Sequence, residues 1–331
     1  MTHAVRRVTC PARAGGSWAL PSPGYVVTRL LQIVPTFLFI MVVVFVLVRL
    51  LPGDPASAIL GERATDEAVA RINARLGLDR PIPVQFAIFV ERFLQGDLGS
   101  SIHLKVPVSQ LVRERLPVTL MLTAYAALLA ILLAVPLAFV AALNRDRGAD
   151  AVIRGAFQVG LSMPVFYIGL VLLTVFAARL RWFPVGGFGD TLGARLHHLF
   201  LPALTLALSL SAVLMRNLRA SIIEVLGAEY VDFARAKGLR PRVVLLRHVL
   251  RNALISTVTL FGLSIGTLIG GAVITETVFA IPGAGRLMIE SIYGRDYPVV
   301  QGLTLALAIL VSLVFLVTDL VQAALDPRIG R

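Results

Sequence analysis

The feature that most constrains this chain is its series of long, nearly uncharged apolar runs. A helix of about 20 apolar residues crosses the hydrocarbon core of a bilayer, and most of these runs reach that length. Apolar residues make up 57% of the 331 residues and charged residues only 15%, with a mean hydropathy of +0.84. One soluble domain could not bury so much apolar surface. We therefore predict an all-α membrane protein with six transmembrane helices, over residues 30–51, 118–143, 153–178, 199–214, 255–281 and 299–325.

The basic residues are distributed unevenly between the two sets of loops that six spans create. Lys and Arg greatly outnumber Asp and Glu in the tail, in loops 144–155 and 216–252 and at the C-terminus. A net charge of +12 would suggest nucleic-acid binding in a soluble protein, but the cytoplasmic loops of membrane proteins carry such an excess. We therefore expect membrane lipid and no nucleic acid as a partner, with both termini in the cytoplasm.

The first third of the chain contains two further segments. Residues 1–24 have the composition of a disordered tail, and residues 25–116 hold the first span followed by a polar, helical, extracytoplasmic segment. Within that segment, residues 65–78 and 83–94 carry helix start and stop signals. The second helix has an apolar face that either packs on the membrane domain or its interface, or forms a small core of its own. That face comprises Phe86, Phe89, Phe93 and Leu94.

Residues 229–254 cannot lie in lipid, although a long apolar run lies on each side of them. Residues 229–237 favour a helix, Gly238 suits the left-handed conformation that ends one, and Pro241 suits the first turn of the next. We predict a short amphipathic helical hairpin at the membrane surface. Its second helix should form an apolar stripe from Val243, Leu246, Val249 and Leu250, with Arg242, Arg247 and Arg251 on or beside the opposite face.

The composition of the hairpin also suggests a docking surface for another protein. Helical spacing places Tyr230, Phe233, Ala234 and Lys237 on one face of its first helix. Ala234 and Ala236 are small, so a partner's backbone could approach them closely. The loop over residues 216–254 is therefore the candidate contact with a protein outside the bilayer.

Several of the predicted spans contain residues that disturb a helix, among them Pro136 in the second span and Pro202 in the fourth. Ser162, Met163 and Pro164 interrupt the third span, and together with Tyr167 they either line a transport pathway or form a kink that a neighbouring helix fills. In the fifth span a glycine recurs every four residues, so one face is nearly bare. That face either packs closely against a neighbour or slides during transport. Its glycines are Gly262, Gly266 and Gly270.

The sequence lacks residues that would supply energy or chemistry. Its two lysines, Lys105 and Lys237, do not lie in a phosphate-binding GxxxxGK[ST] loop, and its histidines lack the HExxH spacing of a zinc site. The single cysteine, Cys10, excludes an internal disulfide. We expect no catalytic residue, no metal site and no bound cofactor in this chain, so any energy that its function requires must come from elsewhere.

Two stretches of the hairpin resemble a known family. The segments ARAKGL at 234–239 and RHVLRNAL at 247–254 are similar to the cytoplasmic EAA loop of ABC importer permeases, in the dipeptide and oligopeptide branch. Aligned on Gly238, the family's Glu-Ala-Ala falls on residues 232–234, where Phe233 departs from the pattern. The resemblance implies a coupling helix that docks on an ATPase subunit. Its residues are Glu229, Tyr230, Asp232, Ala234, Arg235, Ala236, Lys237, Gly238 and Leu239.

A second resemblance to the same family lies after the fifth span. Residues 276–288, ETVFAIPGAGRLM, and 293–302, YGRDYPVVQG, resemble the family's extracytoplasmic loop. The turn-rich PGDP at 52–55 and GDLGSS at 96–101 also resemble it. The residues carried over for this loop are Glu276, Pro282, Gly283, Gly285, Asp296, Tyr297 and Pro298.

The residues of this loop also carry physical expectations. Pro282, Gly283 and Gly285 should turn the chain, and Tyr297 with Pro298 should begin the sixth span. Glu276 lies near the end of a span, so its side chain should extend to the membrane interface rather than serve as a proton relay.

These resemblances imply a type I ABC importer permease fold, with residues 117–325 as a five-helix core and 326–331 as a cytoplasmic end. They imply a pore-forming subunit that carries di- or oligopeptides, or else nickel or glutathione, across the bacterial cytoplasmic membrane. The implied partners are a second permease, two ATP-binding subunits that hold ATP and Mg²⁺, and an extracytoplasmic solute-binding protein. The alternative is an ATP-independent carrier. Such a carrier would be favoured by an internal inverted repeat or by acidic groups deep in the spans, and the sequence shows neither.

Overall fold

The computed structural model describes residues 22–50, 65, 67 and 80–325, and this part of the chain is helical throughout apart from turns and one isolated bridge. Most of the predicted helix at 65–78 and the whole PGDP turn therefore lie outside the described residues. The helices are α1 (Pro23–Leu50), α4 (Ile82–Leu94), α5 (Val108–Leu143), α6 (Gly148–Ser162), α7 (Val165–Leu172), η1 (Leu173–Arg179), α8 (Leu192–Leu226), α9 (Glu229–Ala236), α10 (Pro241–Val243), η2 (Val244–Leu250), α11 (Arg251–Val278), α12 (Ala284–Tyr293) and α13 (Tyr297–Leu325).

Five of the six predicted spans are confirmed as single helical segments long and apolar enough to cross a membrane. They are Pro23–Val46, Val108–Leu143, Leu192–Leu226, Pro241–Val278 and Tyr297–Ala324. Several extend well beyond the apolar runs, because good helix formers such as Leu, Ala, Arg and Glu continue the helix into water. The fourth span, predicted over 199–214, is the clearest case, since α8 has 35 residues.

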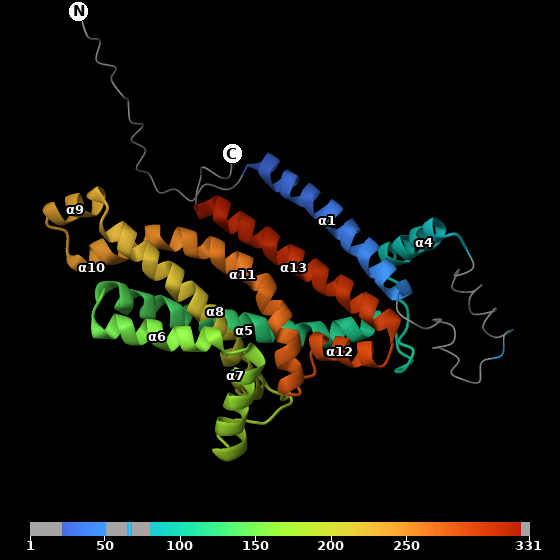
Figure 1. Ribbon diagram of the computed structural model, residues 1–331. Coiled ribbons are helices and arrows are strands. Elements are labelled where there is room, and N and C mark those ends of the chain that lie inside the picture. The colour runs from blue at the N-terminus through green and yellow to red at the C-terminus, as the bar shows by residue number, and fades with distance from the viewer. Residues whose placement is uncertain (1–21, 51–64, 66, 68–79, 326–331) are drawn as a thin grey trace, which may run out of the picture.

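The third predicted span is not a straight helix. It is divided into α6 and α7, which meet at 104° and give the elbow seen at the lower centre of Figure 1. Met163 and Pro164 have extended backbones at the break, with ψ values of 134° and 140°. Proline removes a helical N–H and disfavours a helical conformation in the residue before it. The sequence therefore locates this break, although it does not predict its angle.

The most extensive helix–helix contact joins α5 and α8. Successive turns of α5 bury a residue at every fourth position, and most of these residues are alanine. Helix α8 buries Ala203, Ala207 and Ser211 at the same spacing. Helices in lipid associate mainly through such small residues, because close backbone approach increases van der Waals contact. The α5 positions are Val118, Leu122, Ala126, Ala130, Ala134, Ala138 and Ala142.

Helix α8 is the central helix of the bundle. Its most apolar window is 67% buried, whereas those of the other four segments are 17–33% buried. Figure 1 shows α8 between α5, α6 and α11, with the α9–α10 hairpin at its C-terminal end. The fold therefore joins this hairpin directly to its most buried helix.

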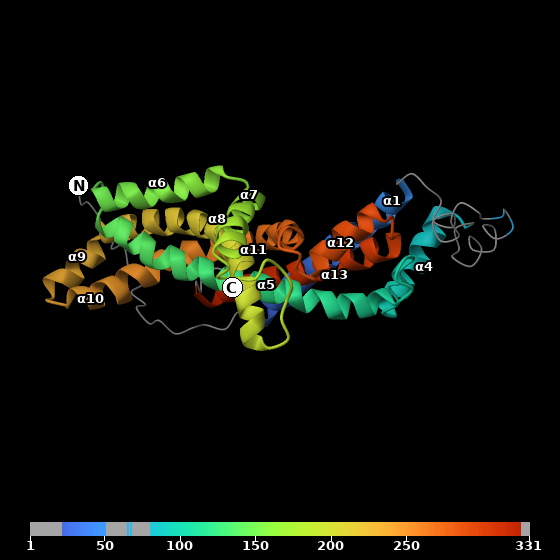
Figure 2. The same ribbon diagram turned by 90° about the horizontal axis from the view of Figure 1, so that it is seen from below.

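Helix α1 lies at the periphery, where it contacts α13 and α4 (Figures 1 and 2). Phe45 of α1 packs against Phe86 and Phe89 of α4, with ring centroids 5.2 and 5.8 Å apart. The apolar face of the outer segment thus packs on the membrane domain, which decides between the two alternatives. Leu94 does not take part, since it is 77% exposed. An ion pair of 3.3 Å between Arg29 and Asp319 joins α1 to α13.

Two of the three α11 glycines that recur every four residues serve close packing against α13. A Cβ on Gly262 would collide with Thr318, and a Cβ on Gly266 would lie 3.1 Å from the Phe315 ring. Gly270 faces open space. The glycine face of α11 therefore packs against α13 at Gly262 and Gly266 but not at Gly270.

We predict that Gly262→Ala destabilises the protein and that Gly270→Ala does not. The added methyl group at 262 meets the β-branched Thr318 side chain, and such overpacking costs about 1–3 kcal/mol. Thermal unfolding of the purified full chain in detergent should show a lower midpoint for Gly262→Ala, partly restored by Thr318→Ala. Equal midpoints for the two glycine variants would contradict this packing.

Candidate functional site

The turn of the hairpin has the geometry that its sequence predicts. Gly238 has a φ of +73°, in the left-handed region. Its N–H donates to the Arg235 carbonyl and the Leu239 N–H donates to the Ala234 carbonyl, at 2.9 and 3.3 Å. This pair of bonds is the Schellman arrangement that ends a helix with glycine at C′. Pro241 occupies the first turn of the next helix, as expected.

The second arm of the hairpin has a different register from the predicted stripe. Its residues Val244–Leu250 form a π-helix, in which hydrogen bonds join residues five apart. The buried side chains are accordingly Val244 and Val249, which are five residues apart. The stripe predicted from helical periodicity is wrong in two of its members, since Val243 is 38% and Leu246 62% exposed.

The first arm, α9, is anchored by a narrow buried edge and exposes the rest of its surface. Val231 and Ala234 are 0% and 6% exposed and belong to the main hydrophobic cluster. The expectation that Ala234 faces a partner is therefore wrong, because its side chain already packs within this chain. Phe233 is 68% exposed and Tyr230 43% exposed, so these two rings form an accessible aromatic surface.

The remaining α9 residues are polar or small and lie on the outside. Asp232 and Arg235 form an exposed ion pair of 3.3 Å within one helical turn. The Tyr230 hydroxyl accepts a hydrogen bond of 3.1 Å from the Asn252 side chain, which connects α9 to the start of α11. Glu229, Ala236, Lys237 and Leu239 are also exposed, so eight of the nine residues predicted for this site, all except Ala234, lie at the surface.

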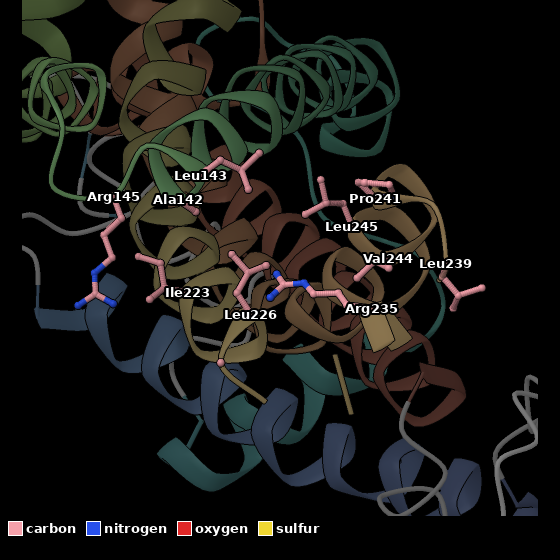
Figure 3. Close-up of a pocket in the computed structure, with 11 residues that line it drawn as sticks. Ala142, Leu143, Arg145, Ile223, Leu226, Arg235, Leu239, Pro241, Val244 and Leu245 are labelled. Atoms are coloured by element: carbon pink, nitrogen blue, oxygen red, sulfur yellow. The ribbon is translucent and has the colours of Figure 1, made fainter. Parts of the chain in front are cut away.

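A cleft of about 740 Å³ lies beneath the hairpin (Figure 3). Its walls come from the end of α5, the end of α8 and both arms of the hairpin. The lining is mostly apolar, with Leu143, Leu226 and Leu245 among its side chains, and Arg145 and Arg235 add two cationic groups. The hairpin therefore contacts the bundle along one edge, and the cleft separates it from the bundle along the other edge.

The opposite end of the bundle contains a buried carboxylate. Glu276 is 0% exposed and accepts hydrogen bonds from the Thr119 hydroxyl at 2.5 Å and the Arg286 N–H at 3.0 Å. The Thr119 oxygen in turn accepts a bond of 2.9 Å from the Ala284 N–H. The prediction that Glu276 extends to the interface is wrong. The sequence signal that could have predicted this burial is the nearby pair Gly283 and Gly285, which leave space for the carboxylate.

Both positions, Gly283 and Gly285, need glycine because other atoms of the chain lie too close for a Cβ atom. A Cβ on Gly283 would collide with the Glu276 carboxylate, and a Cβ on Gly285 would collide with the Val273 backbone. Pro282 and Gly283 lie in the turn before α12, as predicted, whereas Gly285 lies inside the first turn of that helix. Its role is therefore packing against α11 rather than turning the chain.

A second buried carboxylate joins two motifs that are distant in the sequence. Asp296 is 3% exposed and accepts hydrogen bonds from the Ser101 hydroxyl at 2.5 Å and the Ile102 N–H at 3.1 Å. It thereby connects the YGRDYP segment to the GDLGSS segment. Tyr297 is 5% exposed and begins α13, and a Cβ on Gly99 would contact Pro298. Both segments were identified by resemblance, but their contact was not predicted.

The four candidate pathway residues gather at the α6–α7 elbow. Ser162, Met163, Pro164 and Tyr167 are all exposed, and none of them lines either of the two clefts described for this chain. Among the residues that the structure describes, no three His, Cys, Asp or Glu side chains gather to hold a metal ion.

Two regions of the chain match a family of membrane transport components. Residues 134–331 match the family described as "Binding-protein-dependent transport system inner membrane component". Residues 24–123 match the corresponding N-terminal family. The chain belongs to this family of permeases. It is accordingly a multi-pass inner-membrane component of a transport system.

Curated relatives cover nearly the whole permease. It is 41% identical over 305 residues to the "Glutathione transport system permease protein GsiC" of Pectobacterium atrosepticum, covering 92% of this chain and 98% of that protein. It is 38% identical over 308 residues to the "Probable peptide ABC transporter permease protein y4tP" of Sinorhizobium fredii, with the same coverage. These similarities confirm that the permease is an ABC importer permease of the peptide and oligopeptide type.

The fold is similar to that of a solved ABC transporter. The MetNI methionine ABC transporter, in inward-facing conformations, matches with a TM-score of 0.56 and 16% identity, covering 66% of this chain and 97% of that one. A second crystal form of it matches with a TM-score of 0.55. The type I importer permease fold is thus confirmed for the core of the permease.

One charged cluster of the permease was missed by sequence reasoning. Asp150, which is 0% exposed, receives two hydrogen bonds from the Arg219 guanidinium, at 2.7 and 2.6 Å. Arg154 adds an ion pair of 3.3 Å, and the Asp146 N–H donates to the same carboxylate. The cluster ties the start of α6 to α8. Asp150 and Arg219 are 69 residues apart in the sequence, so no local pattern indicates their pairing.

We predict that Thr119→Val destabilises the permease. The change keeps the side-chain shape but leaves the Ala284 N–H and one Glu276 oxygen without this partner. An unsatisfied buried polar group costs about 1–3 kcal/mol. Thermal unfolding in detergent should show a clearly lower midpoint.

Thr267→Val is the matched control for that change. Thr267 is exposed, and its hydroxyl bonds only the Ser264 carbonyl of its own helix. Its unfolding midpoint should stay at the wild-type value. Equal losses in the two valine variants would show that the bridge at Thr119 has no particular importance.

Proposed function

We propose that the permease is the membrane-spanning subunit of an ATP-driven importer and that the hairpin, residues 229–250, is its contact with an ATP-binding subunit. The observation that carries the proposal is the surface of α9. Phe233 and Tyr230 expose aromatic rings on a helix that is fixed at its other edge by Val231 and Ala234. Exposed aromatic rings of this kind are the usual anchors of protein–protein interfaces.

The distribution of charge supports a cytoplasmic position for this hairpin. Lys237 and five arginines lie within residues 229–254, and both termini fall on the same side if six spans cross the membrane. Basic residues concentrate on the cytoplasmic side of membrane proteins. We infer that the N- and C-termini and the hairpin are cytoplasmic, with α4 and α12 on the outer side.

The connections of the hairpin suit the transmission of movement. Only two residues separate the end of α8 at Leu226 from the start of α9 at Glu229. On the other side, the second arm runs without interruption into α11, as one segment from Pro241 to Val278. A displacement of the hairpin by a partner would therefore tilt α8 and α11 together, which is a rigid-body mode of switching.

The cleft beneath the hairpin defines the chemistry of the partner surface. Its apolar walls suit apolar side chains. Arg145 and Arg235 each form an exposed ion pair with a nearby aspartate, and such exposed guanidinium groups can also pair with acidic groups of a partner. We infer that the ATP-binding subunit presents a mixed apolar and acidic surface. The complete importer would contain two such subunits holding ATP and Mg²⁺, a second permease and an external solute-binding protein, with catalysis only on the ATP-binding subunits.

The substrate we propose is a di- or oligopeptide. The support is the similarity to a peptide permease and to glutathione permeases, and glutathione itself is a tripeptide. Glutathione is the second candidate, because relatives with that name are 39–41% identical. Uptake of labelled dipeptides, longer peptides and glutathione by a deletion strain carrying this chain decides between them. Uptake that needs no ATP but follows an ion gradient would contradict the proposal.

We expect Phe233→Ala to reduce ATP-dependent uptake at least about tenfold. Loss of an aromatic anchor at the centre of an interface costs about 2 kcal/mol or more in binding, whereas the side chain adds little to folding because it is exposed. Uptake and membrane abundance should be measured in the same cells. Leu94→Ala removes a side chain that is similarly exposed on α4 and should leave uptake unchanged.

Gly238 allows a separate test of hairpin geometry. A Cβ on Gly238 would meet no atom within 4 Å, so only its positive φ limits the choice of residue. Asn tolerates this conformation and Val does not. We expect Gly238→Val to abolish uptake without loss of membrane insertion, and Gly238→Asn to retain most of it. Full activity of the valine variant would contradict the role assigned to the turn.

A further inference from the structure

A second cleft lies between α6 and α8, separate from the one beneath the hairpin. Its volume is about 550 Å³, and no residue that lines it belongs to α9 or the turn. Arg154 comes from α6, and Arg216 and Arg219 come from α8. No acidic side chain lines it in the described part of the chain. Three guanidinium groups therefore surround one cavity, and nothing in the proposed transport mechanism requires them there.

The charges of this cleft are only partly neutralised within the chain. The buried Asp150 behind it engages Arg219 with two hydrogen bonds and Arg154 with one ion pair. Arg216 has a single neutral partner, the Gln158 side-chain oxygen at 3.4 Å. Among the described residues, Asp150 is the one carboxylate that pairs with these arginines, and the charge of Asp146 also acts on Arg219. Arg216 has no carboxylate partner among these residues, so the cleft keeps an excess of positive charge. Such a site attracts an anionic group.

The cleft changes from polar to apolar along its length. Arg216 and Arg219 lie towards the hairpin end of α8. Ala212 lies about one turn before Arg216 and two before Arg219, and with Phe157 of α6 it lines the cleft with apolar surface. The apolar run predicted for α8 ends at residue 214, so the arginines lie at the level where hydrocarbon gives way to headgroups. Val152 and Val159 of α6 are 71% and 57% exposed, which suits a helix bordered by lipid.

We propose that this cleft binds the phosphate of an anionic phospholipid from the cytoplasmic leaflet. Basic pockets between transmembrane helices on this side suit such headgroups, and the apolar end of the cleft accommodates the beginning of an acyl chain. Arginine is suited to phosphate because its planar guanidinium donates two parallel hydrogen bonds. The assignment to the cytoplasmic leaflet rests on the membrane orientation inferred under the proposed function. The binding of a phosphate by the cleft arginines does not depend on that orientation.

The test measures lipid binding to the purified full chain by native mass spectrometry and thermal unfolding. The probes are dioleoyl-phosphatidylglycerol, dioleoyl-phosphatidylcholine and inorganic phosphate. We expect phosphatidylglycerol to bind at least about tenfold more tightly than phosphatidylcholine. Each arginine near a lipid phosphate contributes about fivefold, so Arg216→Gln should weaken binding about fivefold and Arg154→Gln/Arg216→Gln about 25-fold. Arg219 is left intact because it compensates Asp150.

Arg251→Gln is the matched control, since Arg251 is exposed at the same end of the molecule but does not line the cleft. It should bind phosphatidylglycerol as the wild type does. A rise in the unfolding midpoint with inorganic phosphate but not with phosphatidylglycerol, lost in Arg216→Gln, would show a site for soluble phosphate and would overturn the lipid proposal. Equal affinity for both lipids, or equal weakening by Arg216→Gln and Arg251→Gln, overturns the proposal. Because no transport is measured, these outcomes are independent of the proposed function.

Discussion

Close contact between α5 and α8 is the constraint on which the rest of this structure depends. Lipid tails are as apolar as leucine, so helices in a bilayer gain little from burying large apolar side chains against each other. They gain from close approach, and the alanines from Ala126 to Ala142 allow α5 to approach its neighbours along about four turns. Helix α8 becomes the most buried helix as a result. The hairpin that follows it therefore starts from the best-fixed point of the bundle.

Three buried carboxylates fix the ends of this bundle. Asp150 joins the start of α6 to α8, Glu276 joins α11 to α5 and α12, and Asp296 joins the segment before α13 to the segment before α5. Each one accepts at least two hydrogen bonds, which is the condition under which a buried carboxylate is tolerated. They hold together segments that lie far apart in the sequence. The glycines at 283 and 285 are part of the same arrangement, because larger residues would displace Glu276.

Local physical rules predicted much of this fold, and long-range pairing explains what they missed. Hydropathy located the spans because the bilayer thickness sets helix length, and Gly238 and Pro241 located the hairpin turn because their backbone preferences are intrinsic. The stripe on the second arm was wrong since a π-helix changes which residues share a face. The burial of Glu276 and Ala234 and the pairing of Asp150 with Arg219 depend on partners that no short window of sequence contains.

The central claim is that the exposed rings of α9 contact an ATP-binding subunit while its buried edge carries the movement to α8. Cross-linking in membranes that contain the assembled importer tests it most directly. An Ala236→Cys variant in a Cys10→Ser background keeps both aromatic rings and places the label on the exposed surface of α9. Coupled to a benzophenone maleimide, it should cross-link to the ATP-binding subunit, and a Leu94→Cys variant should not. The contradicting result is an Ala236→Cys importer that transports solute with ATP, yet whose label never reaches that subunit.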